Sequence, residues 1–149
     1  IRPGKPNAAA SGFASSILRE PLQGDDVGNP VTPNSRMLIL SPKRAVQAFI
    51  DIYNADGESL GMNRAVMMNG ISPKISEMLD ALRDYAGDAV TARVRSEPDA
   101  LIQEIVDGWA WFSDGARARA LGMKPDAYLQ EIIETFVAEE LDGKFVAGD

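Results

Sequence analysis

Apolar residues recur at helical spacing in six separate stretches of the chain, with polar residues between them. The clearest stripe runs from residue 128 to residue 137 and predicts an amphipathic helix near the C-terminal end. Five further helices are predicted over residues 11–19, 42–53, 75–86, 101–106 and 114–121. Ser41 followed by Pro42 is a start signal for one of them, because serine caps free backbone N–H groups and proline fits a first turn.

Brief apolar runs between the helices predict short strands. These runs lie at residues 1–2, 36–40, 64–68, 90–94 and 109–112. Residues 25–35 are rich in turn-forming residues and predict an exposed loop with a brief extended piece near Val31, and the tail after Gly143 is expected to fray. Strands alternating with helices indicate an α/β fold. Because the strands are few and short, the sheet is either small or completed by something outside this sequence.

Composition limits the chemistry that the chain can perform. Its 149 residues suit a single domain, residues 1–149, and its 45% apolar and 25% charged residues exclude wholesale disorder. The sequence contains neither Cys nor His, which excludes a thiolate zinc site, a Cys nucleophile and a Ser-His-Asp relay. No pair of carboxylates is convincingly a metal site, so none is predicted.

The charge and the termini indicate the compartment and the kinds of partner. The chain has 15 Lys and Arg residues against 22 Asp and Glu residues, a formal charge of −7, so we expect no nucleic-acid partner. No apolar run approaches the roughly 20 residues of a membrane span, and no secretory signal opens the chain, so we expect a cytoplasmic protein without membrane contact. The opening Ile-Arg-Pro-Gly, without Met, suggests a fragment or a processed product.

Six short motifs follow one another in a recognisable order. They are Arg2-Pro-Gly-Lys-Pro-Asn-Ala-Ala-Ala-Ser11, Arg19-Glu-Pro-Leu22, Arg36 to Pro42, Asn69-Gly-Ile-Ser72, Glu97-Pro-Asp99 and Arg117-Ala-Arg-Ala-Leu-Gly122. Together they resemble the C-terminal half of an extended short-chain dehydrogenase/reductase of the NAD-dependent epimerase/dehydratase family. Its D-erythronate dehydrogenase-like branch, which includes proteins described as nucleoside-diphosphate-sugar epimerases, is the most similar. The resemblance covers nearly the whole chain.

The resemblance implies a parent enzyme in which an N-terminal Rossmann domain holds NAD and a smaller C-terminal domain binds a sugar or sugar-acid substrate. The Gly-x-x-Gly-x-x-Gly fingerprint does not occur among the 13 glycines of this chain. The family's base is a Tyr with Lys four residues later, whereas Tyr53, Tyr85 and Tyr128 are followed at that spacing by Gly57, Ala89 and Ile132. We therefore expect both parts of the hydride-transfer machinery upstream of Ile1, and an inactive chain on its own.

By the resemblance, the loop at the start of the chain passes beside the nicotinamide. Pro3 and Gly4 are thereby predicted backbone contacts of the cofactor, and Lys5 or Asn7 faces the substrate. The family's usual pattern of Arg, two aromatic residues and Asn is not kept, because Pro3-Gly4 replaces the aromatic pair and Asn moves to position 7. Loop solvation and turn formation would explain Lys5 and Asn7 without a ligand.

Arg36 is the strongest candidate for substrate binding. In related epimerases an Arg at this place in the motif binds the substrate diphosphate, and in a sugar-acid enzyme it would hold the carboxylate, since a guanidinium offers a planar fork of donors. A surface ion pair is the alternative explanation. Arg19 is a second candidate, although a cation in the last turn of the first helix would also interact with the helix dipole.

Two classes of function remain open from the sequence. The first is the substrate-binding portion of an NAD-dependent epimerase or dehydrogenase, with NADP not excluded and a homodimer compatible with the family. The second is a stand-alone, non-catalytic binding or interaction module with the same lid fold. Trp109, Trp111 and Phe112 are assigned to packing, because aromatic residues between turns are more often core or interface anchors than ligand platforms.

Overall fold

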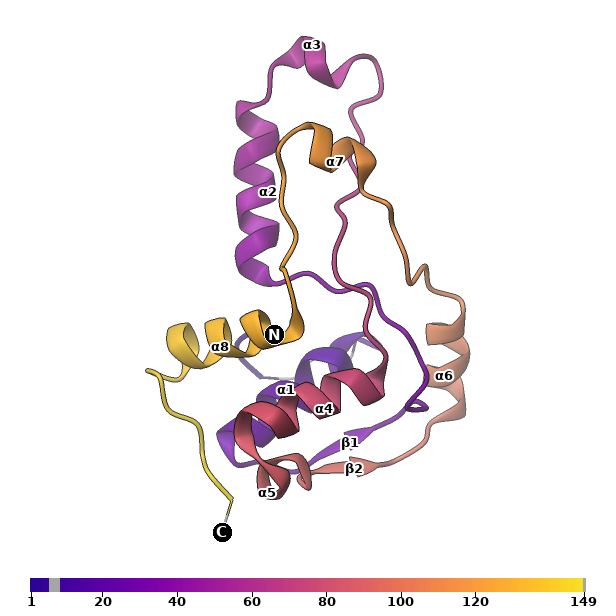
Figure 1. Cartoon of the computed structure of the whole chain (residues 1–149). Helices are drawn as coiled ribbons and strands as arrows, with labels where there is room; N and C mark the ends of the chain where they lie inside the picture. Colours follow the sequence, from indigo (N-terminus) through magenta and orange to yellow (C-terminus); the bar gives the residue numbers. More distant parts are fainter. Residues whose placement is uncertain (6–8, 149) are drawn as a thin grey trace.

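The computed structural model describes residues 1–5 and 9–148. Figure 1 shows a broad base from which a narrower part projects upward. The base contains α1 (Gly12–Gln23), β1 (Val27–Asn29), α4 (Ile75–Ala86), α5 (Asp88–Thr91), β2 (Val94–Ser96) and α8 (Leu129–Glu140), with α6 (Ala100–Asp107) along one side. The upper projection contains α2 (Pro42–Asn54), α3 (Gly57–Leu60) and α7 (Ala116–Ala120).

The main hydrophobic core lies in the base. The apolar faces of α1, α4 and α8 meet there, and the side chains of Ile17, Leu22, Ile75, Leu82 and Ile133 are completely buried. These residues recur at the helical spacing seen in the sequence, which explains why the three helices bury one face each. At about 1.5–3 kcal/mol for each fully buried aliphatic side chain, this cluster supplies most of the driving force for folding of the base.

The fold class expected from the sequence is confirmed, since helices alternate with short parallel strands. β1 pairs with β2 in parallel, with Val27 opposite Val94 and Asn29 opposite Ser96. β2 overlaps the end of the predicted strand at 90–94, and β1 lies in a stretch expected to be a loop. The class was therefore predictable, but most of the strand positions were not.

The other predicted strands were wrong for the described residues. Residues 36–40 form only two isolated antiparallel bridges, Arg36 with Lys74 and Ile39 with Ile71. Residues 1–2, 64–68 and 109–112 lie outside any helix or strand, and the first residues of the 90–94 run belong to α5. An apolar run becomes a strand only where a second strand offers a continuous row of hydrogen bonds, and within the described chain residues 36–40 find only isolated bridges.

The first helix continues four residues beyond the predicted Arg19. Pro21 lies inside α1 without ending it, and the helix closes at Gly24, whose φ of 95° is the left-handed conformation that glycine adopts without strain. Arg19 consequently lies in the body of α1 rather than in its last turn. The helix-dipole explanation for this arginine is therefore wrong.

The C-terminal tail is held against the base instead of fraying as expected. The Arg93 guanidinium donates to the backbone oxygens of Pro21, Val146 and Ala147. The Phe145 ring packs against Tyr85, with 5.7 Å between the ring centroids. One arginine thus ties the end of the chain to the end of α1.

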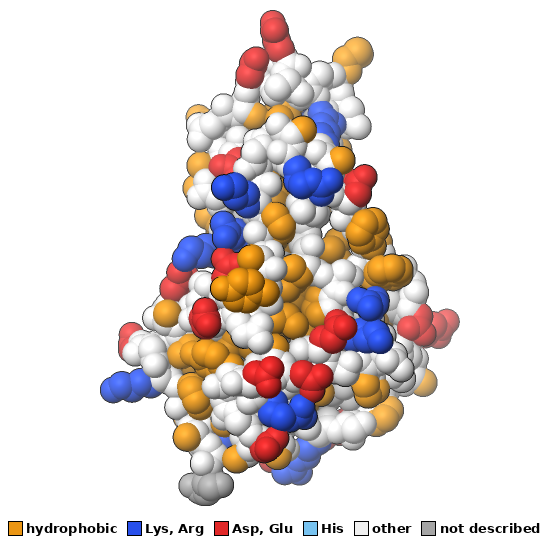
Figure 2. All heavy atoms as spheres, in the orientation of Figure 1, with side chains coloured by type: hydrophobic (Ala, Val, Ile, Leu, Met, Phe, Trp, Pro, Cys, Tyr) orange, Lys and Arg blue, Asp and Glu red, His pale blue; other side chains and the backbone are white. Residues whose placement is uncertain are grey.

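The upper projection has little core of its own. Only Ala48, Ala118 and Met123 form a buried apolar cluster there among the described residues. Figure 2 shows hydrophobic side chains gathered on the surface where the projection meets the base. No helix in residues 1–5 and 9–148 is both long enough and apolar enough to cross a membrane.

Polar contacts fix the projection to the base. The buried Asp126 carboxylate accepts hydrogen bonds from the Ser41 backbone N–H (2.7 Å) and the Ser41 hydroxyl (2.6 Å), and the same hydroxyl caps α2 by accepting from the Arg44 N–H. The Arg44 guanidinium pairs with Glu131 on α8 at 2.8 Å. A hydrogen bond from the Ala127 N–H, and secondarily Arg44, hold the pKa of Glu131 below its usual value.

Replacing Asp126 with alanine should destabilise the chain substantially. Asp126→Ala leaves the buried Ser41 N–H and hydroxyl without their acceptor, so we expect the free energy of unfolding in urea to fall by about 2–4 kcal/mol. Glu140→Ala, at an exposed position on α8, should change it by less than about 0.5 kcal/mol. Equal effects of the two substitutions would show that Asp126 does not anchor α2.

Candidate functional site

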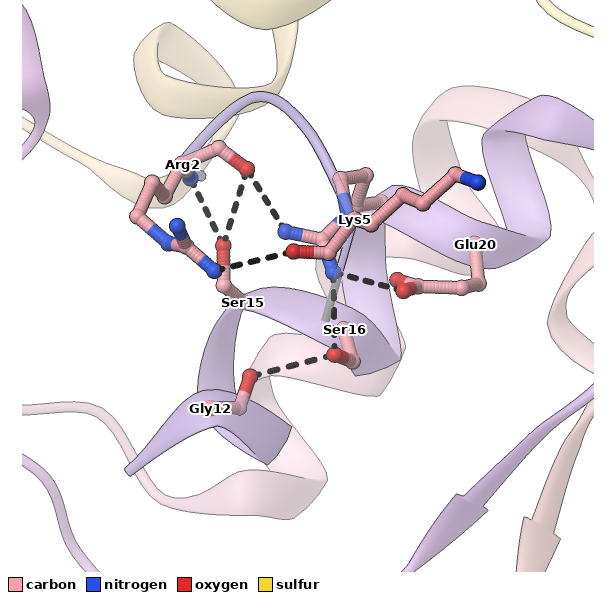
Figure 3. Close-up of polar contacts among 7 residues, drawn as sticks. Arg2, Lys5, Gly12, Ser15, Ser16 and Glu20 are labelled. Atoms are coloured by element: carbon pink, nitrogen blue, oxygen red, sulfur yellow. Dashed lines mark hydrogen bonds and ion pairs between the residues drawn. The ribbon is translucent and has the colours of Figure 1, made fainter. Parts of the chain in front are cut away.

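The start of the chain runs alongside α1 and is fixed to it by polar contacts (Figure 3). The Arg2 backbone N–H donates to the Ser15 hydroxyl at 2.6 Å, and the Arg19 guanidinium donates to the Arg2 carbonyl at 2.7 Å. The Arg2 side chain in turn donates to the Lys5 carbonyl at 3.2 Å. The loop predicted to meet the cofactor therefore has a defined position on this helix.

Arg19 is buried, with 1% of its surface exposed, and it forms an ion pair inside the protein. Its Nη2 lies 2.6 Å from Glu20 Oε1 and 3.2 Å from the Ser16 hydroxyl. The second carboxylate oxygen of Glu20 is buried and has no hydrogen-bond partner among the described residues. The contacts of Arg19 with Arg2, Ser16 and Glu20 give it a structural role, whatever else it binds.

Three of the predicted contact residues share one hollow. Gly4, Lys5 and Arg19 line a space of about 560 Å³ together with Glu20, Gln23, Asp25 and Asp26. Gly4 is exposed, with φ of 83°, and among the described residues no atom beyond its two chain neighbours lies within 4 Å of the position that a Cβ would take. Pro3 is also exposed, and Asn7 lies outside the described residues.

Arg36 lies in a second hollow, of about 240 Å³, near the junction of the projection and the base. Trp109 and Trp111 line it with Arg36, together with Asn34, Ser35, Val106 and Asp107. Arg36 Nη1 donates to the Ser72 carbonyl at 2.7 Å, and its Cζ lies 5.8 Å from the centroid of the Trp111 ring. Within the described chain no hydrogen bond occupies its Nη2 or Nε, so the half-buried guanidinium keeps donors for a ligand.

Trp111 lines the Arg36 hollow, although the sequence interpretation did not include it among the candidate site residues. Trp111 is 53% exposed and Phe112 is 64% exposed, so neither packs into the core of this chain, whereas Trp109 does pack against the main core. The Ser72 hydroxyl donates to the Trp111 carbonyl and holds the loop in place. Gly108 and Asp114 on either side could have signalled a loop, where exposed aromatic side chains more often serve binding.

Arg36 and Arg19 do not lie in the same hollow, so the two predicted substrate-binding arginines are not brought together. The two hollows are lined by different sets of residues. In residues 1–5 and 9–148, no three acidic side chains are close enough together to hold a metal ion. The two hollows are therefore separate candidates for binding an organic ligand, and in the second the Arg36 guanidinium keeps unpaired donors.

No protein-family model matches the chain. It is 46% identical over 122 residues to the D-erythronate dehydrogenase of Cupriavidus necator, a match that covers 82% of this chain and 38% of that enzyme. It is 37% identical over 141 residues to the D-erythronate dehydrogenase of Haemophilus influenzae, covering 95% of this chain and 45% of that enzyme. The chain thus spans less than half the length of these curated relatives.

The structure also matches solved structures. It aligns with the nucleoside-diphosphate-sugar epimerase from Agrobacterium tumefaciens with a TM-score of 0.92 and 42% identity, over 96% of this chain and 42% of that one. It shares the fold of an L-threonine dehydrogenase from Cupriavidus necator at a TM-score of 0.79 and 22% identity. The chain therefore resembles the C-terminal half of an extended short-chain dehydrogenase/reductase of the epimerase/dehydratase family.

Within that family, the chain is similar to the D-erythronate dehydrogenases. Its resemblance to this group was expected from the six motifs, and the comparisons confirm it. The chain is a dehydrogenase- or epimerase-like region of a Rossmann-type protein.

Removing the buried cation of the Arg19–Glu20 pair should lower the stability of the folded chain. Arg19→Met leaves the Glu20 carboxylate buried without its counter-ion, so the free energy of unfolding in urea should fall by about 3–5 kcal/mol. The double variant Arg19→Met/Glu20→Leu should recover much of this loss, because no buried charge is then unpaired. Arg83→Met, which breaks only exposed ion pairs on α4, should lower the free energy of unfolding by less than about 1 kcal/mol. A loss as small as this for Arg19→Met would show that Arg19 is not a structural residue.

Proposed function

We propose that this chain is the substrate-binding portion of a nicotinamide-dinucleotide-dependent dehydrogenase or epimerase that acts on a sugar or a sugar acid. The observation that carries the proposal is the Arg36 guanidinium, which keeps free donors in a hollow beside Trp111, in a chain 46% identical to a D-erythronate dehydrogenase. The dinucleotide loop and the Tyr/Lys base belong to a part of the protein that precedes residue 1 in this numbering.

The charges around Arg36 favour a sugar acid over a nucleotide sugar. Arg36 is the only cation that lines this hollow in the described chain, and Asp107 supplies one carboxylate. A single guanidinium suits a single carboxylate, with a planar fork of hydrogen bonds, whereas a diphosphate usually needs several donors or cations. We propose D-erythronate, or an acid of similar size, as the substrate. Its hydroxyl groups would meet polar atoms of Asn34 and Asp107, and the Trp111 ring would cover its carbon chain.

The residues at the start of the chain fit the nicotinamide end of a dinucleotide but not its diphosphate. Gly4 presents backbone without a side chain, and in the part of the chain that the structure describes only its chain neighbours come within 4 Å of its Cβ position, which would allow a flat ring to approach closely. The hollow beside Gly4 is lined by Glu20, Asp25 and Asp26 against the cations Lys5 and Arg19, and Arg19 is already paired with Glu20. The carboxylates outnumber the cations, which disfavours a diphosphate. We propose Pro3 and Gly4 as backbone contacts of the cofactor. Lys5 lines the hollow beside Gly4 and not the Arg36 hollow, so Lys5 and Asn7 stay predictions as substrate contacts.

The division of chemistry follows from these positions. The dinucleotide, when bound, accepts or returns a hydride. This chain's residues bind and orient the substrate: Arg36 fixes the carboxylate end, and Trp111 excludes water from one side of the hollow. Arg19 contributes by holding the Arg2–Lys5 loop on α1. A cytoplasmic location, the choice between NAD and NADP, and a homodimer stay predictions.

Truncating Arg36 should weaken substrate binding. In the intact enzyme, or in a fusion of this chain to the part of the Cupriavidus necator relative outside the match, Arg36→Ala should raise the KM for D-erythronate about 10-fold or more. This corresponds to losing a charge-assisted hydrogen bond of about 1.5–3 kcal/mol. Steady-state kinetics with D-erythronate and NAD measure the change.

Two matched variants make the test specific. Arg36→Lys keeps the charge but loses the fork, so its KM should lie between those of the parent and Arg36→Ala. Arg83→Ala, a surface arginine on α4, should leave KM unchanged. If Arg36→Ala also leaves KM unchanged, Arg36 does not bind the substrate.

A further inference from the structure

Ser72 hydrogen-bonds to both Arg36 and Trp111, the two residues to which the proposed function gives the main part in substrate binding. Its backbone carbonyl accepts from Arg36 Nη1 at 2.7 Å, and its hydroxyl donates to the Trp111 carbonyl. The guanidinium and the indole also face each other, with 5.8 Å between the Arg36 Cζ and the centroid of the ring. A single serine therefore joins the cation of this hollow to its exposed aromatic ring.

The Ser72 carbonyl is fixed from both sides along the chain. The preceding Ile71 exchanges two backbone hydrogen bonds with Ile39, at 2.9 and 3.0 Å. The carbonyl of the following Pro73 accepts from the Met37 N–H at 3.1 Å. A residue that precedes proline is also confined to extended backbone conformations. Because both neighbours of Ser72 are tied to the segment that begins with the arginine, its carbonyl is a fixed acceptor for the guanidinium.

This acceptor determines which edge of the Arg36 guanidinium is left for a ligand. Nη1 lies on the same side of the planar group as Cδ, and Nε and Nη2 form the opposite edge. In the described chain that opposite edge makes no hydrogen bond. Its two N–H bonds are nearly parallel, so they match the two oxygens of a carboxylate. The Ser72 carbonyl thus leaves free the edge that suits a sugar acid.

The Ser72 hydroxyl anchors the loop that carries Trp111. No other hydrogen bond reaches the backbone of residues 110–112 within the described part of the chain. The Trp111 side chain is half exposed, so burial fixes its ring only in part. The hydroxyl therefore contributes to the distance at which the ring lies from the Arg36 guanidinium.

We propose that Ser72 is the positioning residue of the substrate site. Its carbonyl directs the Nε–Nη2 edge of Arg36 toward the substrate carboxylate, and its hydroxyl holds Trp111 beside that carboxylate. Ser72 touches neither substrate nor cofactor in this arrangement and acts through the two other side chains. The inference rests on the proposed function, because it requires that Arg36 and Trp111 bind the substrate. The alternative is that the hydroxyl only stabilises a folded loop.

Steady-state kinetics of serine variants test the proposal in the intact enzyme, or in the fusion to the remainder of the Cupriavidus necator relative. Ser72→Ala should raise the KM for D-erythronate about 3-fold or more and change kcat less than about 2-fold, because one positioning hydrogen bond is lost and no reacting group is touched. Ser72→Thr keeps the hydroxyl and should restore most of the parent KM. Ser72→Cys offers only a weak donor, so it should behave like Ser72→Ala.

A matched control and a double variant show whether the hydroxyl acts through the ring. Ser59→Ala removes an exposed hydroxyl that also donates to a backbone carbonyl, at the start of α3, and should leave KM unchanged. Trp111→Ala should raise KM by itself. Adding Ser72→Ala to Trp111→Ala should then raise KM less than about 2-fold further, because the ring that the hydroxyl positions is already absent.

Fluorine NMR of the same protein labelled with fluorotryptophan reports the position of the ring without any turnover. The Trp111 signal is identified by its loss in Trp111→Phe. Without substrate, Ser72→Ala should move this signal toward that of free fluorotryptophan, whereas Ser72→Thr and Ser59→Ala should leave it in place. A purely structural hydroxyl would change stability and leave the signal of the folded protein where it is.

The proposal is overturned if Ser72→Ala leaves KM unchanged, or if it raises KM by the same factor with and without the Trp111 ring. A Trp111 signal that does not move in Ser72→Ala would overturn it equally. Failure of the proposed function has a different signature. In that case KM would not respond to Arg36→Ala, and the positioning role would fall with it, although the Trp111 signal would still move in Ser72→Ala.

Discussion

The apolar face of α2 is wider than the surface that this chain offers to cover it. For this reason the upper projection has only a small core of its own. An amphipathic helix is stable when a second layer buries its apolar side. For α1, α4 and α8 that layer exists, because each covers the others and their shared core is closed to solvent. For α2 the layer is only partly present: among the described residues its Ala48 forms a small buried cluster with just Ala118 and Met123.

Polar contacts help to hold the upper projection in place, whereas the base is held together mainly by apolar burial. Ser41 and Asp126 hold the start of α2, and Arg44 reaches Glu131 on α8, so the orientation of α2 is set at its base-facing end. Residues 36–41 connect the base to this helix. Arg36 therefore lies at the junction of the two parts, with Trp111 from a distant loop across from it. A site at such a junction can be completed by a neighbouring domain without any change in the core.

Most helices could be predicted from the sequence, whereas the short helices α3 and α5 and most strands could not, for a physical reason. Helical hydrogen bonds form within one segment, so periodicity and the Ser41-Pro42 start signal are sufficient. Strands need partners, and residues 64–68 have a strand's pattern without a pairing strand among the described residues. The same distinction applies to the site. Arg36 could be predicted from the order of the motifs, whereas Trp111 reaches it only through folding. Arg19 was predicted as a candidate, but burial beside Glu20 is a tertiary property that sequence spacing does not encode.

The central claim is that these residues bind the substrate side of the reaction, whereas the dinucleotide is held elsewhere in the protein. Isothermal titration of NAD into the chain alone and into its fusion with the remainder of the Cupriavidus necator relative tests this most directly. We predict no measurable heat of binding for the chain alone and a saturable binding isotherm for the fusion. Micromolar or tighter binding of NAD by the chain alone would contradict the claim, because these residues lack a glycine-rich loop for the diphosphate.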